Sequence, residues 1–464
     1  MVFSTVSFLF YFLPIFLVLY AFAPTRNMVL LAASLIFYAW GEPIYVLLLL
    51  VSVGVNYLAG LWVAARPGDR LPLLFGVAAN LGMLGYFKYA NLLVGSLNSL
   101  TSEIGGTSMD WTPVALPLGI SFYSFQAMSY LIDVHRGHAQ VERSPAALAV
   151  YLAMFPQLVA GPIVRFASVA KQINRRNHTF DRATLGLSFF IIGLSQKVLI
   201  ANTIAVAVDG IFALEASHLS TPLAWAGMVG YTLQIYFDFN GYSNMAIGLG
   251  LVLAFKFPRN FNYPYISTSV TEFWRRWHIS LSGWFRDYLY IPLGGNRQGP
   301  WRTSFNLATV FLLCGLWHGA SWTFLVWGLY HGLLLSVERW GLNRLLQCLP
   351  LLVRHLYLLL AIMFGWVIFR ADNFEQLGHY YSALFGFSDI GVELPVLLFF
   401  TQDVLIACVI AVVASTPWHR SKRLRLHNRA VAVSLSSSWL LILFVLCLTF
   451  VASGSYNPFI YFRF

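Results

Sequence analysis

His318 is the residue of this chain whose setting points most directly to chemistry. No charged side chain occurs from Phe305 to Cys314 or from Thr323 to Leu335, so this histidine lies between two hydrophobic segments. An imidazole at membrane depth is costly, and an ionisable residue there is by default a candidate for function. Glycines at 315 and 319 remove side-chain bulk on both sides of the ring and leave it open to substrate. The alternative is a core histidine that is hydrogen-bonded to a neighbouring helix.

A second histidine, His278, lies in the aromatic segment 269–288. Ser269 followed by Glu272 has the pattern of a capping box, which predicts the start of a helix. Apolar side chains then recur every three or four residues, so we expect one helix in the cytoplasmic membrane interface or folded into the protein beneath it. His278 falls on the border of this stripe and is a candidate for the same site as His318. A lone interfacial histidine is the alternative.

Polar side chains interrupt the long hydrophobic segment 223–254. The segment is too long for one straight span of about 20 residues, and we expect its helix to break near Gly241. Gln234 and Asp238 are four residues apart and share a helical face, and a carboxylate inside a membrane needs a partner. Asp238 and Asn240 are therefore candidates for lining a substrate tunnel. A structural hydrogen-bond network fits them equally well.

Basic residues accumulate between Lys256 and Arg302, where seven stand against two acidic residues. Arg275 and Arg276 lie off the aromatic stripe and could contact a polyanion such as coenzyme A or a phospholipid headgroup. The net charge of +11 is spread over short loops, as the enrichment of basic residues in cytoplasmic loops explains. We therefore expect membrane lipids and no nucleic acid among the partners.

The composition predicts a polytopic membrane protein. Of its 464 residues 58% are hydrophobic and only 10% are charged, and the mean hydropathy is +0.69. One soluble core could not bury that much apolar surface, so we expect an all-α protein with roughly 10–12 transmembrane helices plus re-entrant segments. Candidate spans lie near 5–22, 28–41, 43–64, 72–95, 117–134, 185–207, 223–254, 351–368, 397–416 and 432–452, with shorter pieces at 147–164 and 304–338.

Basic loops predict which segments turn back inside the membrane. The clusters from Arg165 to Arg182 and from Arg420 to Arg429 should be cytoplasmic. Both flanks of 147–164 are basic, as are both flanks of 304–338, so each piece should enter and return. The second piece then forms two helical arms with His318 at their apex.

Several function classes leave no trace in the sequence. The four cysteines are far apart and lack the spacing of metal ligands, and we expect no metal site. We find neither an internal repeat typical of secondary transporters nor a nucleotide-binding glycine loop.

These segments resemble the membrane-bound O-acyltransferase family, and within it the bacterial branch typified by the membrane subunit of alginate O-acetylation. The resemblance follows the chain in order over nearly its whole length, which makes it more specific than any single motif. The matching stretches are Ser34–Trp40, Gly85–Asn91, Leu116–Tyr123, Phe155–Pro162, Gln234–Gly250, Thr271–Asn296, Gly315–Gly319 and Tyr456–Phe464. Asn240, Asn244 and His135 depart from the usual pattern of this branch, so cellulose or another glycan is as compatible as alginate.

The resemblance implies that His318 is the catalytic histidine and that His278 is the second position of the family pattern. It implies helices and re-entrant segments around a central tunnel, in a single acyltransferase domain over 1–464 with its catalytic core at about 117–340. It also implies no bound cofactor, acetyl-CoA as the donor, and a location in the bacterial inner membrane. Periplasmic acetyltransferases and polysaccharide-synthesis proteins would be the partners.

Acyl transfer from a thioester needs a base for the hydroxyl nucleophile and a donor that steadies the oxyanion. We hypothesise that neutral His318 is the base, since apolar surroundings disfavour the charged imidazole. His278 would polarise the carbonyl or position the donor, and Trp317 and Trp322 would shape the tunnel. Two alternatives remain open: a polysaccharide or small-molecule conduit, and an acyltransferase whose acceptor is a lipid or teichoic acid.

Overall fold

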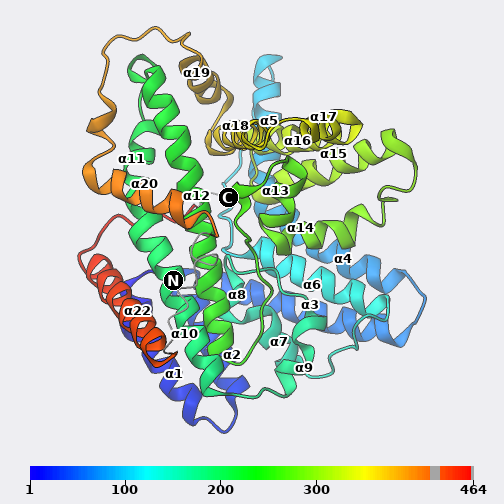
Figure 1. The fold of residues 1–464 in the computed structure, drawn as a ribbon. Helices are drawn as coiled ribbons and strands as arrows, with labels where there is room; N and C mark the ends of the chain where they lie inside the picture. Colours follow the sequence, from blue (N-terminus) through cyan, green and yellow to red (C-terminus); the bar gives the residue numbers. More distant parts are fainter. Residues whose placement is uncertain (418–428, 461–464) are drawn as a thin grey trace. The chain divides into compact units, whose positions relative to one another are not determined.

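The computed structural model describes residues 1–417 and 429–460, with side chains omitted for 429–436. The described residues form α-, 3-10- and π-helical segments joined by loops, with no strand among them (Figure 1). The basic residues Arg420 to Arg425 lie outside the described residues, as do 461–464, the end of the last matching motif. Two compact units can be distinguished, each built from two stretches of chain: 1–186 with 246–258, and 187–245 with 259–464.

The first unit contains the amino-terminal helices and the end of one long helix. Its elements are η1 (Ser7–Phe12), α1 (Leu13–Phe22), α2 (Arg26–Gly41), α3 (Tyr45–Ala65), α4 (Leu71–Leu84), η2 (Gly85–Tyr89), α5 (Ala90–Glu103), α6 (Ile120–His135), α7 (Pro145–Ala153), α8 (Phe155–Leu158) and α9 (Phe166–Asn174). Two helices pass from one unit to the other: α10 (Phe180–Ser195) and α12 (Thr221–Val252).

The second unit carries the remaining elements. They are η3 (Gln196–Ala201), α11 (Asn202–Phe212), η4 (Ala216–His218), η5 (Pro264–Ile266), α13 (Val270–Arg276), α14 (Ile279–Phe285), η6 (Arg286–Tyr290), α15 (Gly299–His318), α16 (Trp322–Val337), η7 (Glu338–Leu342), α17 (Asn343–Cys348), α18 (Leu351–Arg370), α19 (Phe374–Leu384), η8 (Val396–Leu398), α20 (Gln402–Ala414) and α22 (Arg429–Ala452).

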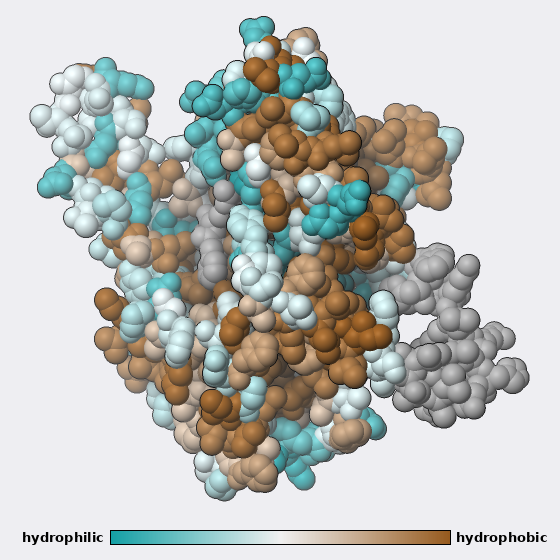
Figure 2. Space-filling view, turned by 90° about the vertical axis from the view of Figure 1, so that its left-hand side faces the viewer, coloured by the Kyte–Doolittle hydropathy of each residue, from teal (hydrophilic) through white to brown (hydrophobic). Residues whose placement is uncertain are grey.

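The surface is that of an integral membrane protein. Large apolar side chains such as Phe22, Ile44 and Leu352 are 86%, 76% and 78% exposed, and hydrophobic residues cover broad areas of the face in Figure 2. Exposed apolar area of this extent is suited to lipid. The helices long and apolar enough to cross a membrane are Tyr45–Ala65, Leu71–Glu103, Phe180–Phe212 and Leu351–Arg370, and shorter apolar helices are Ser7–Phe22, Gln402–Ala414 and Ser437–Ala452. The all-α membrane fold is confirmed, while the total of 10–12 spans stays a prediction.

The segment 147–164, which was expected to enter the membrane and return, is not one continuous helix. α7 ends at Ala153, the four-residue α8 follows, and the chain to Arg165 is not helical. All residues from 147 to 164 are buried, and the backbone N–H of Phe155 donates to Ser34 Oγ of α2 at 3.1 Å. Protein therefore surrounds this irregular backbone, as a membrane protein requires.

One sequence-based expectation is wrong in α12, which runs unbroken through Gly241. Gly241 does not break the helix; it allows α12 to pack closely against α10. A Cβ at Gly241 would lie 2.8 Å from the carbonyl oxygen of Gly193 on α10, and a Cβ at Gly193 would lie 2.5 Å from that of Gly241. Backbones can approach this closely only where neither residue has a side chain.

The expected helical hairpin around His318 is confirmed. α15 and α16 pack side by side in the second unit (Figure 1). A Cβ at Gly315 would overlap the carbonyl oxygen of Phe324, and a Cβ at Gly328 would overlap that of Phe311. These two glycines therefore permit the tight packing of the two arms.

The expected single helix over 269–288 is wrong. The chain forms α13, breaks at Trp277 and His278, and resumes as α14. The predicted start is confirmed, since Ser269 Oγ accepts from Glu272 N at 3.1 Å. The helix breaks because His278 has a positive φ of 41°, in the left-handed region. Asn260, which lies outside the segment, then caps α14 by accepting from Ser280 N.

Candidate active site

His318 is the last residue of α15 and is 5% exposed. The helix ends there because Gly319 is extended, and Ser321 then caps α16 by accepting from Thr323 N at 3.3 Å. The imidazole is surrounded by aromatic rings, whose centroids lie 5.0 Å (Trp317), 5.1 Å (Trp327) and 5.2 Å (Phe369) from its own. Aromatic side chains therefore pack around the ring at the apex of the hairpin.

His278 lies close to His318, and both belong to the second unit. Their ring centroids are 6.4 Å apart, and His278 is fully buried. It does not sit on the border of an interfacial stripe, because the break between α13 and α14 turns it into the protein. Its Nδ1 lies 3.1 Å from Asn260 Oδ1, whereas its Nε2 has no hydrogen-bond partner among the described residues. Two imidazoles from separate elements are thus close enough to act on one substrate.

A small cavity lies against His318. It has a volume of about 10 Å³, room for one water molecule. It is lined by Ile235, Phe239, Trp277, His318, Trp327, Trp366, Phe369 and Ile460.

A larger and more polar cavity of about 640 Å³ lies beside the small one, and Ile460 lines both. Arg370 and Asp209 form an ion pair at 2.8 Å in its wall, and Tyr456 donates to the same carboxylate at 2.9 Å. Gln234 also lines it, 2% exposed, with no hydrogen-bond partner for Oε1 among the described residues. The volume is typical of small-molecule sites.

Asp238 has the partner that its position requires. It forms a buried ion pair with Lys197 of η3 and accepts from the backbone N–H of Ile460 at 3.1 Å. Lys197 also donates to the carbonyl oxygen of Pro458. The pair therefore holds the carboxy-terminal segment that forms part of both cavities. In the sequence, Lys197 is the only charged residue of the candidate span 185–207, a signal that could have identified the partner.

The other candidate residues are placed less closely around His318. Asn240 is buried and donates to Gln196 Oε1 at 3.2 Å. Trp317 contacts the imidazole, whereas Trp322 is 54% exposed at the start of α16 and does not line the small cavity. Trp327, one turn and a half further along α16, takes the place expected of Trp322.

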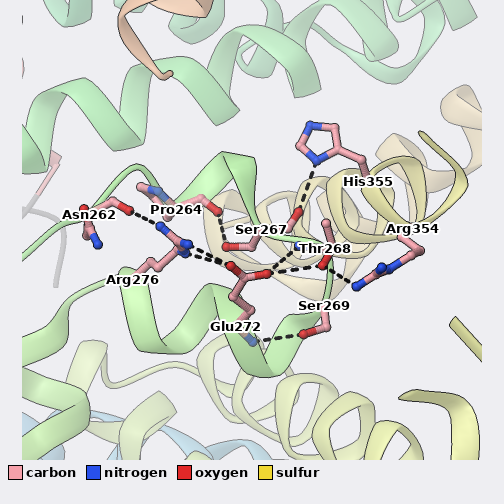
Figure 3. Close-up of polar contacts among 9 residues, drawn as sticks. All are labelled: Asn262, Pro264, Ser267, Thr268, Ser269, Glu272, Arg276, Arg354 and His355. Carbon is pink, nitrogen blue, oxygen red and sulfur yellow. Dashed lines mark hydrogen bonds and ion pairs between the residues drawn. The ribbon is translucent and has the colours of Figure 1, made fainter. Parts of the chain in front are cut away.

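The two arginines of α13 also lie away from the small cavity. Arg275 is exposed, and Arg276 is engaged in a local network (Figure 3). In this network Arg276 pairs with Glu272 at 2.8 Å and donates to the carbonyl oxygen of Asn262 at 3.2 Å. Burial opposes ionisation of Glu272, but the hydrogen bonds from Thr268 and Arg276 outweigh it, so the pKa of the Glu272 carboxyl lies below its usual value. Arg276 thus holds the loop before α13 in place.

Glu338 is a further buried residue that sequence reasoning missed. Its carboxylate accepts from Val270 N at 2.6 Å and from Thr271 N at 2.9 Å, at the start of α13. An anion at this end satisfies free N–H groups and the helix dipole. Glu338 therefore fixes the helix that precedes His278. Among the described residues no group of three or more acidic, histidine or cysteine side chains could hold a metal ion.

Comparisons with known proteins agree on one family. Residues 106–369, which include both histidines, match the model of the membrane-bound O-acyltransferase family. Over the full length of both chains the protein is 43% identical to a probable alginate O-acetylase of Pseudomonas putida. It is 47% identical to the corresponding protein of Pseudomonas aeruginosa, over 83% of this chain and 75% of the relative. A peptidoglycan O-acetyltransferase of Helicobacter pylori is 33% identical over 100% of this chain and 98% of its own.

Proposed function

This chain belongs to the membrane-bound O-acyltransferase family and is an O-acyltransferase, and we propose that it passes acetyl groups from a cytoplasmic donor across the inner membrane for O-acetylation of an exopolysaccharide. The identities of 43% and 47% to probable alginate O-acetylases favour alginate as the polymer. Cellulose and related glycans remain compatible, as does another envelope polymer, since a peptidoglycan O-acetyltransferase is also a relative.

The observation that carries the proposal is the pair of buried imidazoles, of which His318 lines the small cavity. His318 and His278 come from different elements, both are buried, and their ring centroids lie 6.4 Å apart. A purely structural role would not call for two such costly groups at one place. The arrangement matches a site that moves a proton during transfer of an acyl group.

His318 is the base of the proposed reaction. Its nitrogen takes the proton of the acceptor hydroxyl while the hydroxyl oxygen forms a bond to the thioester carbonyl carbon. The carbon–sulfur bond then breaks, and the same imidazolium returns the proton to the departing thiolate. Trp327 and Phe369 pack against the ring and limit its access to bulk water, which favours transfer to the intended hydroxyl over hydrolysis.

Donor and acceptor would reach His318 by different routes. Acetyl-CoA is the proposed donor, and the basic residues between Lys256 and Arg302 would attract its phosphates. The 640 Å³ cavity would admit the acceptor group, because it adjoins the small cavity and carries polar side chains such as Gln234. A periplasmic acetyltransferase would collect the acetyl group there and deliver it to the polymer.

The test replaces His318 by alanine in cells that make the acetylated polymer. Acetylation should fall to background while the protein remains in the membrane at its normal level, because the base is lost. Acetyl content of the isolated polymer is measured by mass spectrometry, and the protein by immunoblotting of membranes.

Two histidine variants serve as controls. His331→Ala removes another buried imidazole from the same hairpin, and His379→Ala removes an exposed one. The His379→Ala strain should acetylate the polymer normally. The His331→Ala strain shows how much acetylation is lost when a buried imidazole is removed from the hairpin without removing the proposed base. Normal acetylation in the His318→Ala strain would refute the proposal.

A further inference from the structure

Asn260 is the immediate neighbour of His278 and is itself 1% exposed. It lies outside the helices, in the loop that precedes η5. Its backbone oxygen accepts from Ile279 N at 2.9 Å, and its side-chain oxygen accepts from Ser280 N at 3.2 Å and from Ser280 Oγ at 2.9 Å. Asn260 therefore caps α14 and at the same time reaches the imidazole of His278.

The contact with Ser280 fixes which end of the Asn260 amide faces the histidine. A backbone N–H can only donate, so the atom that it contacts at 3.2 Å must be the amide oxygen and not the NH₂ group. That same oxygen lies 3.1 Å from Nδ1 of His278. An oxygen can only accept here, so Nδ1 must carry a hydrogen.

The tautomer decides what the other ring nitrogen can do. A neutral imidazole has one N–H, and when this is Nδ1–H the Nε2 atom has only a lone pair. Nε2 is buried and has no hydrogen-bond partner among the described residues. A buried acceptor left unsatisfied is costly and calls for an explanation, such as a ligand that is bound during function. The strained backbone of His278, with φ of 41°, is a further cost that persists only where the surroundings impose it.

We propose that Asn260 is a positioning residue that holds His278 as the Nδ1–H tautomer, so that Nε2 accepts a hydrogen bond from an N–H or O–H group of a substrate. This inference rests on the proposed acyl transfer and narrows the part of His278 in it. Neutral His278 has no hydrogen to give from Nε2 and does not polarise the acyl carbonyl. It positions a substrate beside the base His318 by accepting a hydrogen bond from that substrate.

The test reads the tautomer directly by ¹⁵N NMR of the full-length protein labelled at histidine, in detergent micelles. The His278 signal is identified by its loss in a His278→Ala variant. In the wild-type protein Nε2 should show the shift of an unprotonated nitrogen and Nδ1 that of a protonated one. Asn260→Leu should shift His278 toward the Nε2–H tautomer, whereas Asn260→Asp keeps an acceptor oxygen and should restore Nδ1–H.

Acetyl transfer to a soluble hydroxyl acceptor supplies the second readout. Asn260→Leu should lower kcat at least about tenfold, as expected when a proton-handling residue is wrongly oriented, and Asn260→Asp should recover most of it. Asn262→Leu is the matched control, because Asn262 lies two residues further along the chain and its side chain makes no hydrogen bond among the described residues. The histidine spectrum and kcat of this variant should be unchanged.

The spectra and the kinetics separate the two levels of the claim. A protonated Nε2 in the wild-type protein would overturn this inference even if acetyl transfer is normal, as would an unchanged tautomer in Asn260→Leu. Absence of acetyl transfer in the wild-type protein would instead refute the proposed function, while the predicted spectra would still establish Asn260 as the residue that sets the tautomer. If Asn260→Leu does not fold, the wild-type spectrum alone decides.

Discussion

Replacing Asp238 by alanine should destabilise the protein by about 3–5 kcal/mol, the usual effect of removing one partner from a buried ion pair. The side chains of Lys197 and Asp238 are only 1% and 2% exposed, so the remaining lysine could not regain water. The variant also loses the hydrogen bond from Ile460 N at 3.1 Å, which anchors the carboxy-terminal segment. Most of the destabilisation should come from the uncompensated charge and not from the lost bond.

The double variant Lys197→Met with Asp238→Leu separates these two causes. It removes both charges and keeps apolar volume, so its stability should lie within about 2 kcal/mol of the wild type, because a buried ion pair and an apolar pair often differ little. The free energy of unfolding is measured by denaturant titration in detergent micelles, with intrinsic tryptophan fluorescence as the probe.

The outcome of this cycle can contradict the reasoning in two ways. Asp238→Ala within 1 kcal/mol of the wild type would show that the pair is not buried as described. A double variant no more stable than Asp238→Ala would show that the uncompensated charge is not what destabilises the single variant. Loss of acetyl transfer in a stable double variant would mean that the ion pair serves the reaction through the segment it holds.

Three further changes test other parts of the structure. Gly328→Leu should prevent folding of the hairpin, because even a Cβ there would overlap the carbonyl oxygen of Phe311; a monodisperse peak in size-exclusion chromatography would contradict this. Trp322→Ala should leave acetyl transfer within about threefold of the wild type, since this side chain is 54% exposed; a loss above tenfold would place it in the tunnel after all. Glu272→Gln should reduce stability at neutral pH, because the folded-state pKa of Glu272 lies below its ordinary 4.5 and the ionised form is therefore the stabilising one. The difference should disappear as the pH falls below 4.5 through the folded-state pKa, and a difference that does not depend on pH in thermal melts would show that the charge is not involved.

The sequence predicted best where a single physical constraint dominates. The basic flanks of 304–338 and the absence of charge around His318 located the hairpin and its apex, because few ionisable residues are tolerated inside a membrane. The same reasoning required a partner for Asp238, although it did not identify Lys197. Distance along the chain conceals that pairing, which depends on how η3 and α12 pack. Gly315 and Gly319 do not open the ring to substrate as expected, since both pack against Phe324.

The errors have a common origin in tertiary contacts. Helical periodicity predicted one helix across His278, but the periodicity of side chains does not report a cap supplied by a distant residue such as Asn260. A break was expected near Gly241 because polar residues interrupt 223–254 and the segment is too long for one straight span, whereas here the glycine permits α12 to cross α10 closely. Trp322 was expected to shape the tunnel, but its side chain is 54% exposed, and Trp327 of α16 lines the small cavity instead.

The most direct test of the account measures acetyl transfer by the purified full-length protein in proteoliposomes supplied with labelled acetyl-CoA and a soluble hydroxyl acceptor. The wild type and His379→Ala should each form acetylated acceptor and free coenzyme A in a one-to-one ratio. A folded His318→Ala variant should form neither product. Acetyl transfer that persists without the His318 imidazole would contradict the claim that this residue is the base of the reaction.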